Sequence, residues 1–228
     1  MEGLERLIDH APMFPPASLD VRDAVMEDAR ARSSEHAWML ARFVCPASKL
    51  AELGAVRGWD DAPGLSVVLD DDVPLPSGAP VEAIEMVGTP RAGLPDLELF
   101  CEVALDELAA VAAAGAKAKL RCGGARVPSV EEVAAFFAAA RDLELPFKAT
   151  AGLHHPVRSE REHGFLNFLT AAELARDGAG EGELREVLAT TDPEALGTGS
   201  AAGRELFVSI GSCSFTEPVE DLRALGLL

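Results

Sequence analysis

The chain has 228 residues, of which 48% are hydrophobic and 25% are charged, a balance typical of one soluble α/β domain. Its 38 acidic and 20 basic residues give a formal net charge of −18, which argues against nucleic acid or an anionic membrane as a partner. No apolar stretch could span a bilayer and no secretory signal begins the chain, so the sequence predicts a cytoplasmic protein.

The cysteines indicate reduced, buried thiols. Each of the four lies in or beside an apolar run, and none belongs to a CxxC pair: Cys45, Cys101, Cys122 and Cys213. Because no spacing fits a zinc site, the sequence predicts no metal and no other cofactor.

The first 35 residues are predicted to form a helical segment that precedes the main fold. Phe14-Pro15-Pro16-Ala17 interrupts the chain, and a helix is expected from Ser18 to Arg32, with apolar residues on one side.

Short apolar runs then recur along the chain, and we expect each of eight to form a strand. They are Trp38–Cys45, Leu65–Leu69, Val81–Val87, Leu97–Ala104, Ala116–Cys122, Pro146–Leu153, Gly164–Leu169 and Leu206–Ile210. Helices are predicted between several of them, at Ser48–Val56, Leu105–Ala114, Ser129–Leu143, Ala171–Arg176 and Pro218–Leu225.

Strands that alternate with helices favour right-handed βαβ units, and eight such units close into a (β/α)8 barrel of the TIM type. The links after the second and third predicted strands are rich in Pro and Gly and too short for good helices. We therefore predict one small α/β barrel domain over residues 1–228, with some outer helices reduced or missing. The apolar surface that missing helices would leave favours a homodimer. An open doubly wound sheet is the alternative, but Cys45-Pro46-Ala47 is not the glycine-rich loop it would need.

Parity along the strands predicts a charged barrel interior. Lys117, Lys119 and Arg121 share one face of the fifth predicted strand. The same rule groups Lys148, Thr150, Gly152 and His154 on the sixth strand and Glu98, Phe100 and Glu102 on the fourth. Further interior side chains are expected from the first, third and seventh strands, namely Arg42, Glu85 and Asn167.

Lysines are rare in this chain, which has sixteen arginines and only four lysines, so lysines inside apolar runs require an explanation. A lysine beside other cations in an apolar pocket has a lowered pKa and can attack a carbonyl as a neutral amine. We therefore predict Lys119 and Lys148 as catalytic residues.

The segments Lys119-Leu120-Arg121-Cys122-Gly123-Gly124 and Lys148-Ala149-Thr150-Ala151-Gly152 resemble the paired lysine strands of class I aldolases of the deoxyribose-phosphate aldolase type. The resemblance covers about forty residues. In this chain the two lysines lie on the fifth and sixth predicted strands, one strand earlier than in that family. It implies that one lysine forms a Schiff base and that the other tunes it. The segments 14–17 and 148–156 are also similar to uncharacterised bacterial proteins, a resemblance that implies no activity.

Other candidates lie at the expected rim. His154 or Glu102 would move a proton, and Arg121 would bind an anion. A further set is expected to contact substrate at the strand ends, namely Arg42, Glu85, Thr150, Asn167, Gly211 and Ser212, with Gly211 and Ser212 in a stretch of small residues whose backbone could face a phosphate. Asp70-Asp71-Asp72 could hold Mg²⁺, although a solvated acidic loop is the simpler interpretation.

Three functions remain open from the sequence. The first is a cofactor-free lyase or isomerase acting on a small anionic carbonyl or phosphorylated compound. The second is a metal-dependent barrel enzyme in which His154, His163 and a carboxylate such as Glu102 bind the ion. The third is a non-catalytic barrel that binds an anion or a partner protein, for which every lysine would be paired and the rim would lack an open pocket.

Overall fold

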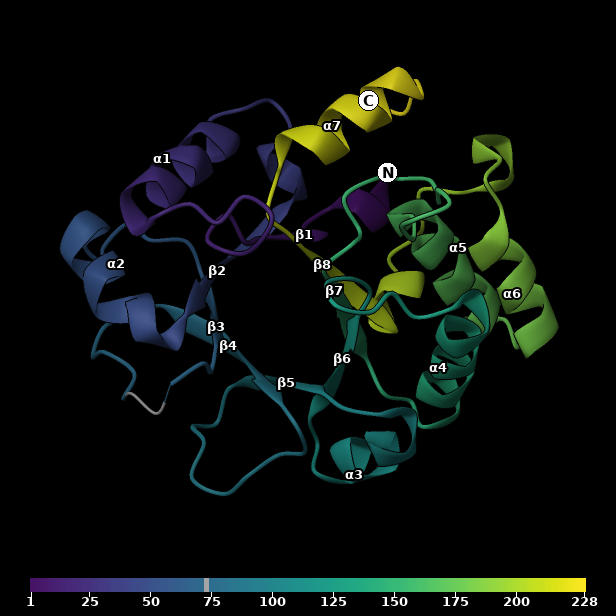
Figure 1. The fold of residues 1–228 in the computed structure, drawn as a ribbon, viewed down its shortest axis with the longest axis horizontal. Coiled ribbons are helices and arrows are strands. Elements are labelled where there is room, and N and C mark those ends of the chain that lie inside the picture. The colour runs from purple at the N-terminus through teal and green to yellow at the C-terminus, as the bar shows by residue number, and fades with distance from the viewer. Residues whose placement is uncertain (72–73) are drawn as a thin grey trace.

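The computed structural model describes residues 1–71 and 74–228 and contains a closed barrel of eight parallel strands (Figure 1). In chain order around the barrel they are β1 (Ile8–His10), β2 (Leu40–Pro46), β3 (Leu65–Val68), β4 (Val81–Val87), β5 (Glu98–Glu102), β6 (Lys117–Arg121), β7 (Phe147–Thr150) and β8 (Phe207–Ser212). The predicted small TIM-type barrel is confirmed.

Seven α-helices in the described residues surround much of the barrel (Figure 1). They are α1 (Val21–Arg32), α2 (Leu50–Arg57), α3 (Leu108–Ala113), α4 (Val130–Asp142), α5 (Phe165–Arg176), α6 (Glu181–Ala189) and α7 (Thr216–Ala224). Within the described chain no helix follows β3 or β4, which confirms the prediction that outer helices are missing there.

The prediction for the N-terminal segment is wrong in one respect, because residues 8–10 form β1 rather than part of a helical segment outside the barrel. β1 pairs with β2 on one side and with β8 on the other, so it closes the ring. The strand has only three residues and carries Asp9 and His10, both fully buried, so no apolar run marks it in the sequence.

The seventh predicted strand is also wrong, because Gly164–Leu169 leads into and begins α5. Residues 165–169 are all buried, and a continuously buried run shows neither strand nor helix periodicity. The missed β1 and this misassigned run compensate each other, which is why the predicted count of eight strands is correct. The lysine strands are therefore β6 and β7, not the fifth and sixth.

The main hydrophobic core lies between the barrel wall and the outer helices. Phe147 of β7 and Phe207 of β8 project outward and pack against Phe137 of α4, with ring centroids 4.9 and 6.4 Å from the Phe137 ring. Ala118 and Ala149 share this outward orientation and are fully buried. Since outward side chains are apolar, the opposite parity of β6 and β7 faces the barrel interior, as predicted.

The remaining sequence predictions concern the cysteines, membrane-spanning segments and the oligomeric state. All four cysteines are free and buried. No helix in the described residues is long and apolar enough to cross a membrane. The homodimer stays a prediction.

Candidate functional site

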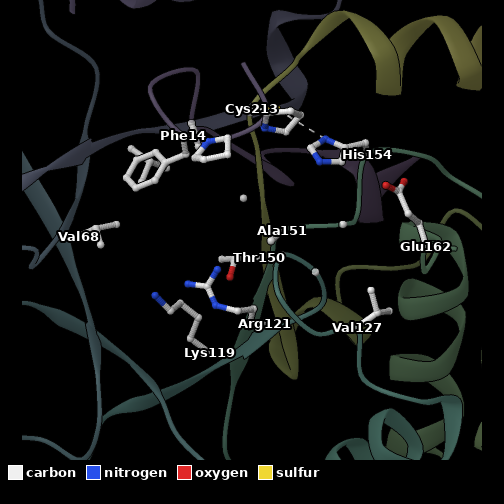
Figure 2. A pocket seen from close by; sticks show the side chains of 18 of the residues that line it. Phe14, Val68, Lys119, Arg121, Val127, Thr150, Ala151, His154, Glu162 and Cys213 are labelled. Carbon is white, nitrogen blue, oxygen red and sulfur yellow. Dashed lines mark hydrogen bonds between the residues drawn. The ribbon is translucent and has the colours of Figure 1, made fainter. Parts of the chain in front are cut away.

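A cavity of about 540 Å³ opens at the carboxyl ends of the strands, where barrel enzymes bind their substrates (Figure 2). Its floor and one side are polar and come largely from β4, β6 and β7, with Glu85, Lys119, Arg121 and Thr150 among the lining residues. Loops after the strands complete the rim. Of the predicted interior residues of β6 and the strand β7 with its following turn, Lys119, Arg121, Thr150, Gly152 and His154 line this cavity, whereas Lys117 and Lys148 do not.

Lys119 presents its amine to this cavity while the rest of its side chain is enclosed. The side chain is 4% exposed, and Nζ lies 3.5 Å from an oxygen of Glu85 and 3.2 Å from an oxygen of Glu102. Figure 2 shows Lys119 and Arg121 projecting together toward the open space. Lys119 is therefore a nearly buried amine with one side free for a ligand.

Lys148 lies beside Lys119 in the strand register but does not line the cavity. Its side chain is 0% exposed, and Nζ donates to Asp9 at 2.5 Å and to Glu85 at 2.6 Å. Ser209 donates to the same Asp9 oxygen at 2.8 Å, and Ser66 donates to the same Glu85 oxygen at 2.7 Å. Lys148 is thus the centre of a buried, hydrogen-bonded cluster beneath the cavity.

The protonation states of this cluster follow from burial and from the neighbouring charges. Burial alone would raise the pKa of Glu85, but the charges of Lys148 and Lys119 outweigh it and lower that pKa to about 2. Burial would lower the pKa of Lys148, yet Asp9 and Glu85 reverse the direction and raise it. The expectation that a lowered pKa makes Lys148 a neutral amine is therefore wrong, because two carboxylates surround it.

Arg121 and Glu102 form an ion pair on the cavity side of Lys119. Arg121 donates from Nε at 2.6 Å and from Nη2 at 3.1 Å to the two oxygens of Glu102. The structure gives Nη1 of Arg121 no hydrogen-bond partner among the described residues. Arg121 lines the cavity and can therefore offer Nη1 to an anionic group on a ligand.

Thr150 adds a second unoccupied polar group. Its Oγ1 is buried and has no hydrogen-bond partner in the described part of the chain, although the residue lines the cavity. A buried hydroxyl normally finds a partner, so Thr150 places an unsatisfied polar atom beside the cavity. Gly211, which also lines the cavity, lets the Thr150 side chain fit, because a Cβ there would lie 3.2 Å from Cγ2 of Thr150.

Arg42 does not contact the cavity, so its prediction as a substrate-binding residue is wrong. It sits near the amino ends of the strands and pairs with Glu82 at 3.0 Å and with Glu98 at 2.7 Å. Lys117 pairs with the same Glu98. These ion pairs close the bottom of the barrel, below the Phe100 ring, whose centroid lies 5.3 Å from Nζ of Lys148 and 5.7 Å from Nζ of Lys117.

Asn167 is likewise wrongly predicted, because it belongs to α5 and not to an inward-facing strand. Its amide nitrogen donates to the carbonyls of Val187 and Thr190 at 2.8 and 2.9 Å, and its oxygen accepts from the backbone of Arg158. Asn167 therefore fixes the end of α6 and the loop before α5.

His154 lies at the rim, where the sequence placed it. Nδ1 is 3.4 Å from Oγ of Ser212, 3.9 Å from Sγ of Cys213 and 3.9 Å from a carboxylate oxygen of Glu217. Figure 2 shows the contact between His154 and Cys213. Ser212 itself is buried and donates to the carbonyl of Ser214, so it supports His154 and is not among the residues lining the cavity. Burial raises the pKa of the Cys213 thiol, which disfavours a thiolate nucleophile there.

The predicted metal ligands do not come together. His163 is buried and bonds through Nε2 to the carbonyl of Pro128 at 2.8 Å, while Glu102 is held by Arg121 and Lys119. Within residues 1–71 and 74–228, no three His, Cys, Asp or Glu side chains gather as a metal site would require. Asp70 bonds to the backbone and hydroxyl of Ser48, and Asp72 lies outside the described residues.

Asp9, Ser66 and Ser209 are site residues that the sequence analysis missed. Ser66 and Ser209 lie within short apolar runs and Asp9 lies in β1, and all three are buried against Lys148 or its partners. The polar parity rule would have found Asp9 if Ile8–His10 had been recognised as a strand.

The turns after β6 and β7 shape one side of the cavity. Ala151 and Gly152 both have positive φ, of 59° and 68°, and a Cβ on Gly152 would lie 2.8 Å from the carbonyl oxygen of Cys122. The two turns are therefore packed backbone against backbone, with Gly123 and Gly152 at the contact.

Comparison with known proteins gives no match: no family model, no curated protein and no solved structure matches the chain. The function is therefore inferred from the geometry of the site.

Proposed function

We propose that the protein is an enzyme of the lyase or isomerase type that forms a Schiff base between Lys119 and a small carbonyl substrate. The observation that carries the proposal is the position of the Lys119 amine, which reaches the open cavity from an otherwise buried side chain. Lys148 is assigned a positioning role, because its amine is occupied by Asp9 and Glu85 and does not line the cavity.

The surrounding groups suit the steps of this chemistry. Lys119 first gives a proton to Glu102, 3.2 Å away, and the resulting amine attacks the carbonyl carbon while the C=O electrons move to oxygen. The oxygen then takes up protons and leaves as water, which gives a protonated imine. That imine accepts the electron pair released when a bond at the neighbouring carbon breaks, while His154 at the rim accepts or returns the proton.

Two features favour a reactive role for Lys119 over a purely structural role as an ion-pair partner inside the barrel. The carboxylate of Glu85 forms ion pairs with both lysines and so relates the positions of their amines. The lysines also stand on the sixth and seventh strands, so the difference in strand number from the aldolases that the sequence resembles disappears. Arg121, through its unpartnered Nη1, is the candidate for binding one anionic group of the substrate.

Reductive trapping tests the proposal. The protein is incubated with small aldehydes, ketones and oxo acids in the presence of borohydride, and adducts are located by tandem mass spectrometry. Because the chain has four lysines, each can be assigned, and the exposed Lys49 reports nonspecific labelling. We expect a specific adduct on Lys119 that the variant Lys119→Met loses; labelling confined to Lys49 and the N-terminal amine would refute the proposal.

The same experiment separates the non-catalytic alternative. That alternative is favoured by one observation, since all four lysines are paired with carboxylates. Its second expectation, a rim without an open pocket, does not fit the cavity described above. A barrel that only binds an anion would retain ligand binding and give no Lys119 adduct with any carbonyl compound.

A further inference from the structure

The cavity has a second side whose chemistry differs from that of the lysine side. Among the described residues, the loop after β1 and the strands β2 and β3 contribute only apolar side chains there, namely Ala11, Phe14, Pro15, Pro16, Val44 and Val68. We call this set the apolar wall. Figure 2 shows Phe14 and Val68 across the open space from Arg121 and Thr150. None of these side chains offers a hydrogen bond, so a hydroxylated ligand would lose water contacts there without replacement.

The charges on the polar side cancel within the protein. Three carboxylates, on Asp9, Glu85 and Glu102, face three cations in the same cluster, on Lys119, Lys148 and Arg121. At the mouth, Arg161 and Glu162 both line the cavity and carry opposite charges. A doubly charged phosphate would therefore meet no net positive charge, and of the Arg121 guanidinium only Nη1 is without a partner in the described structure.

We infer that the substrate is a carbonyl compound with an apolar aliphatic or aromatic group, and not a phosphorylated sugar. The inference rests on the proposed function, in that Lys119 must be the amine that reacts. The carbonyl carbon would lie at Nζ of Lys119, and the apolar group would lie against the apolar wall. A single carboxylate could be accommodated at Nη1 of Arg121, and the cavity volume lies within the range of small-molecule sites.

The test compares aldehydes that differ in polarity but not in size. 3-Methylbutanal and glyceraldehyde have the same number of non-hydrogen atoms, and glyceraldehyde 3-phosphate adds the phosphate. Each is trapped with cyanoborohydride, and the rate of labelling at Lys119 is divided by the rate at Lys49 of the same sample. This ratio removes differences in the intrinsic reactivity of the aldehydes.

We expect the labelling ratio for 3-methylbutanal to exceed that for either glyceraldehyde compound by about tenfold or more. The reason is that the branched chain is removed from water when it packs against the apolar wall. Val68→Ser introduces a hydroxyl into the apolar wall and should reduce the difference in labelling ratio between 3-methylbutanal and the two glyceraldehyde compounds. Val56→Ser serves as the matched control, because Val56 is exposed on α2 and does not line the cavity. Circular dichroism verifies that each variant is folded.

The outcomes separate the two proposals. Lys119 labelling that is equal or faster with glyceraldehyde or its phosphate would overturn the inference about the substrate and leave the Schiff-base proposal intact. Absence of Lys119 labelling with every aldehyde, while Lys49 is labelled, would overturn both.

Discussion

At the scale of single residues, Lys148 and its two carboxylates decide how the barrel interior is built. A buried ion pair is costly to form, but removal of one member is costlier, because it leaves an uncompensated charge in the interior. Lys148 compensates Asp9 and Glu85 together, so its loss would leave two carboxylates without their main partner.

Lys148→Met should therefore lower the free energy of unfolding by about 3–5 kcal/mol. Urea denaturation followed by circular dichroism measures this change. Lys49→Met is the control, since Lys49 forms only an exposed pair with Glu52 and its loss should change stability by less than about 1 kcal/mol. Equal effects of the two substitutions would contradict the assignment of Lys148 as the centre of the cluster.

Glu85 should make the stability depend on pH in the acid range. Its pKa is lowered in the folded protein to about 2 from an ordinary value of 4.5, so the folded state favours the ionised form. The resulting stabilisation, about 3 kcal/mol, is present above pH 4.5 and is lost as the pH falls toward 2.

Comparison of the unaltered protein with Glu85→Gln at several pH values tests this linkage. The difference in unfolding free energy between the two should be largest near neutral pH and should shrink as the pH falls from 4.5 toward 2. A difference that stays constant over this range would show that ionised Glu85 contributes nothing specific.

At the scale of elements, the turns after β6 and β7 bring the site residues into place. Gly152 has φ +68°, a region that residues with a Cβ rarely adopt, and its neighbour Cys122 leaves no space for a methyl group. The packing of these two turns keeps Arg121 and Thr150 on the same side of the cavity.

Gly152→Ala should destabilise the fold by about 1–2 kcal/mol from the backbone alone, with a further cost from the contact with Cys122. Thermal or urea unfolding measures it. Gly182→Ala provides a control of opposite sign, because Gly182 lies in α6, has open space around it, and alanine there favours the helix by up to about 1 kcal/mol. Similar effects of the two alanine substitutions would show that the turn is not constrained.

The elements also show which parts of the site could be predicted from sequence. Parity on β6 and β7 placed Lys119, Arg121 and Thr150 correctly, because polar residues alternate there with buried apolar ones. Arg42 was expected at the cavity, since parity gives the face of a strand but not the depth along the barrel. The predicted position of Asn167 is wrong because Phe165–Leu169 is buried throughout and lacks the periodicity that distinguishes a helix from a strand.

At the scale of the whole molecule, closure of the barrel depends on its shortest and least apolar strand. β1 contains no apolar run and so is not predicted from the sequence, yet it joins β8 to β2 and supplies Asp9 to the interior cluster. The predicted number of eight strands is thus correct, but only because one missed strand, β1, is offset by one segment, Gly164–Leu169, that is wrongly predicted as a strand.

Removal of residues 1–12 should accordingly prevent folding, because it exposes the edges of β2 and β8 and deletes one partner of Lys148. Far-ultraviolet circular dichroism and size-exclusion chromatography measure the outcome. Asp9→Asn keeps the strand and removes only the charge, so this variant should fold with reduced stability. A truncated chain that remains folded and monomeric would contradict the role of β1 in closure.

The most direct test of the central claim is a crystal structure of the protein reduced with borohydride in the presence of 3-methylbutanal. The account predicts continuous density from Nζ of Lys119 into the cavity, with the branched chain against Phe14 and Val68 and with Lys148 still bound to Asp9 and Glu85. Density joined to Lys148, or an empty cavity with an unmodified Lys119, would contradict it.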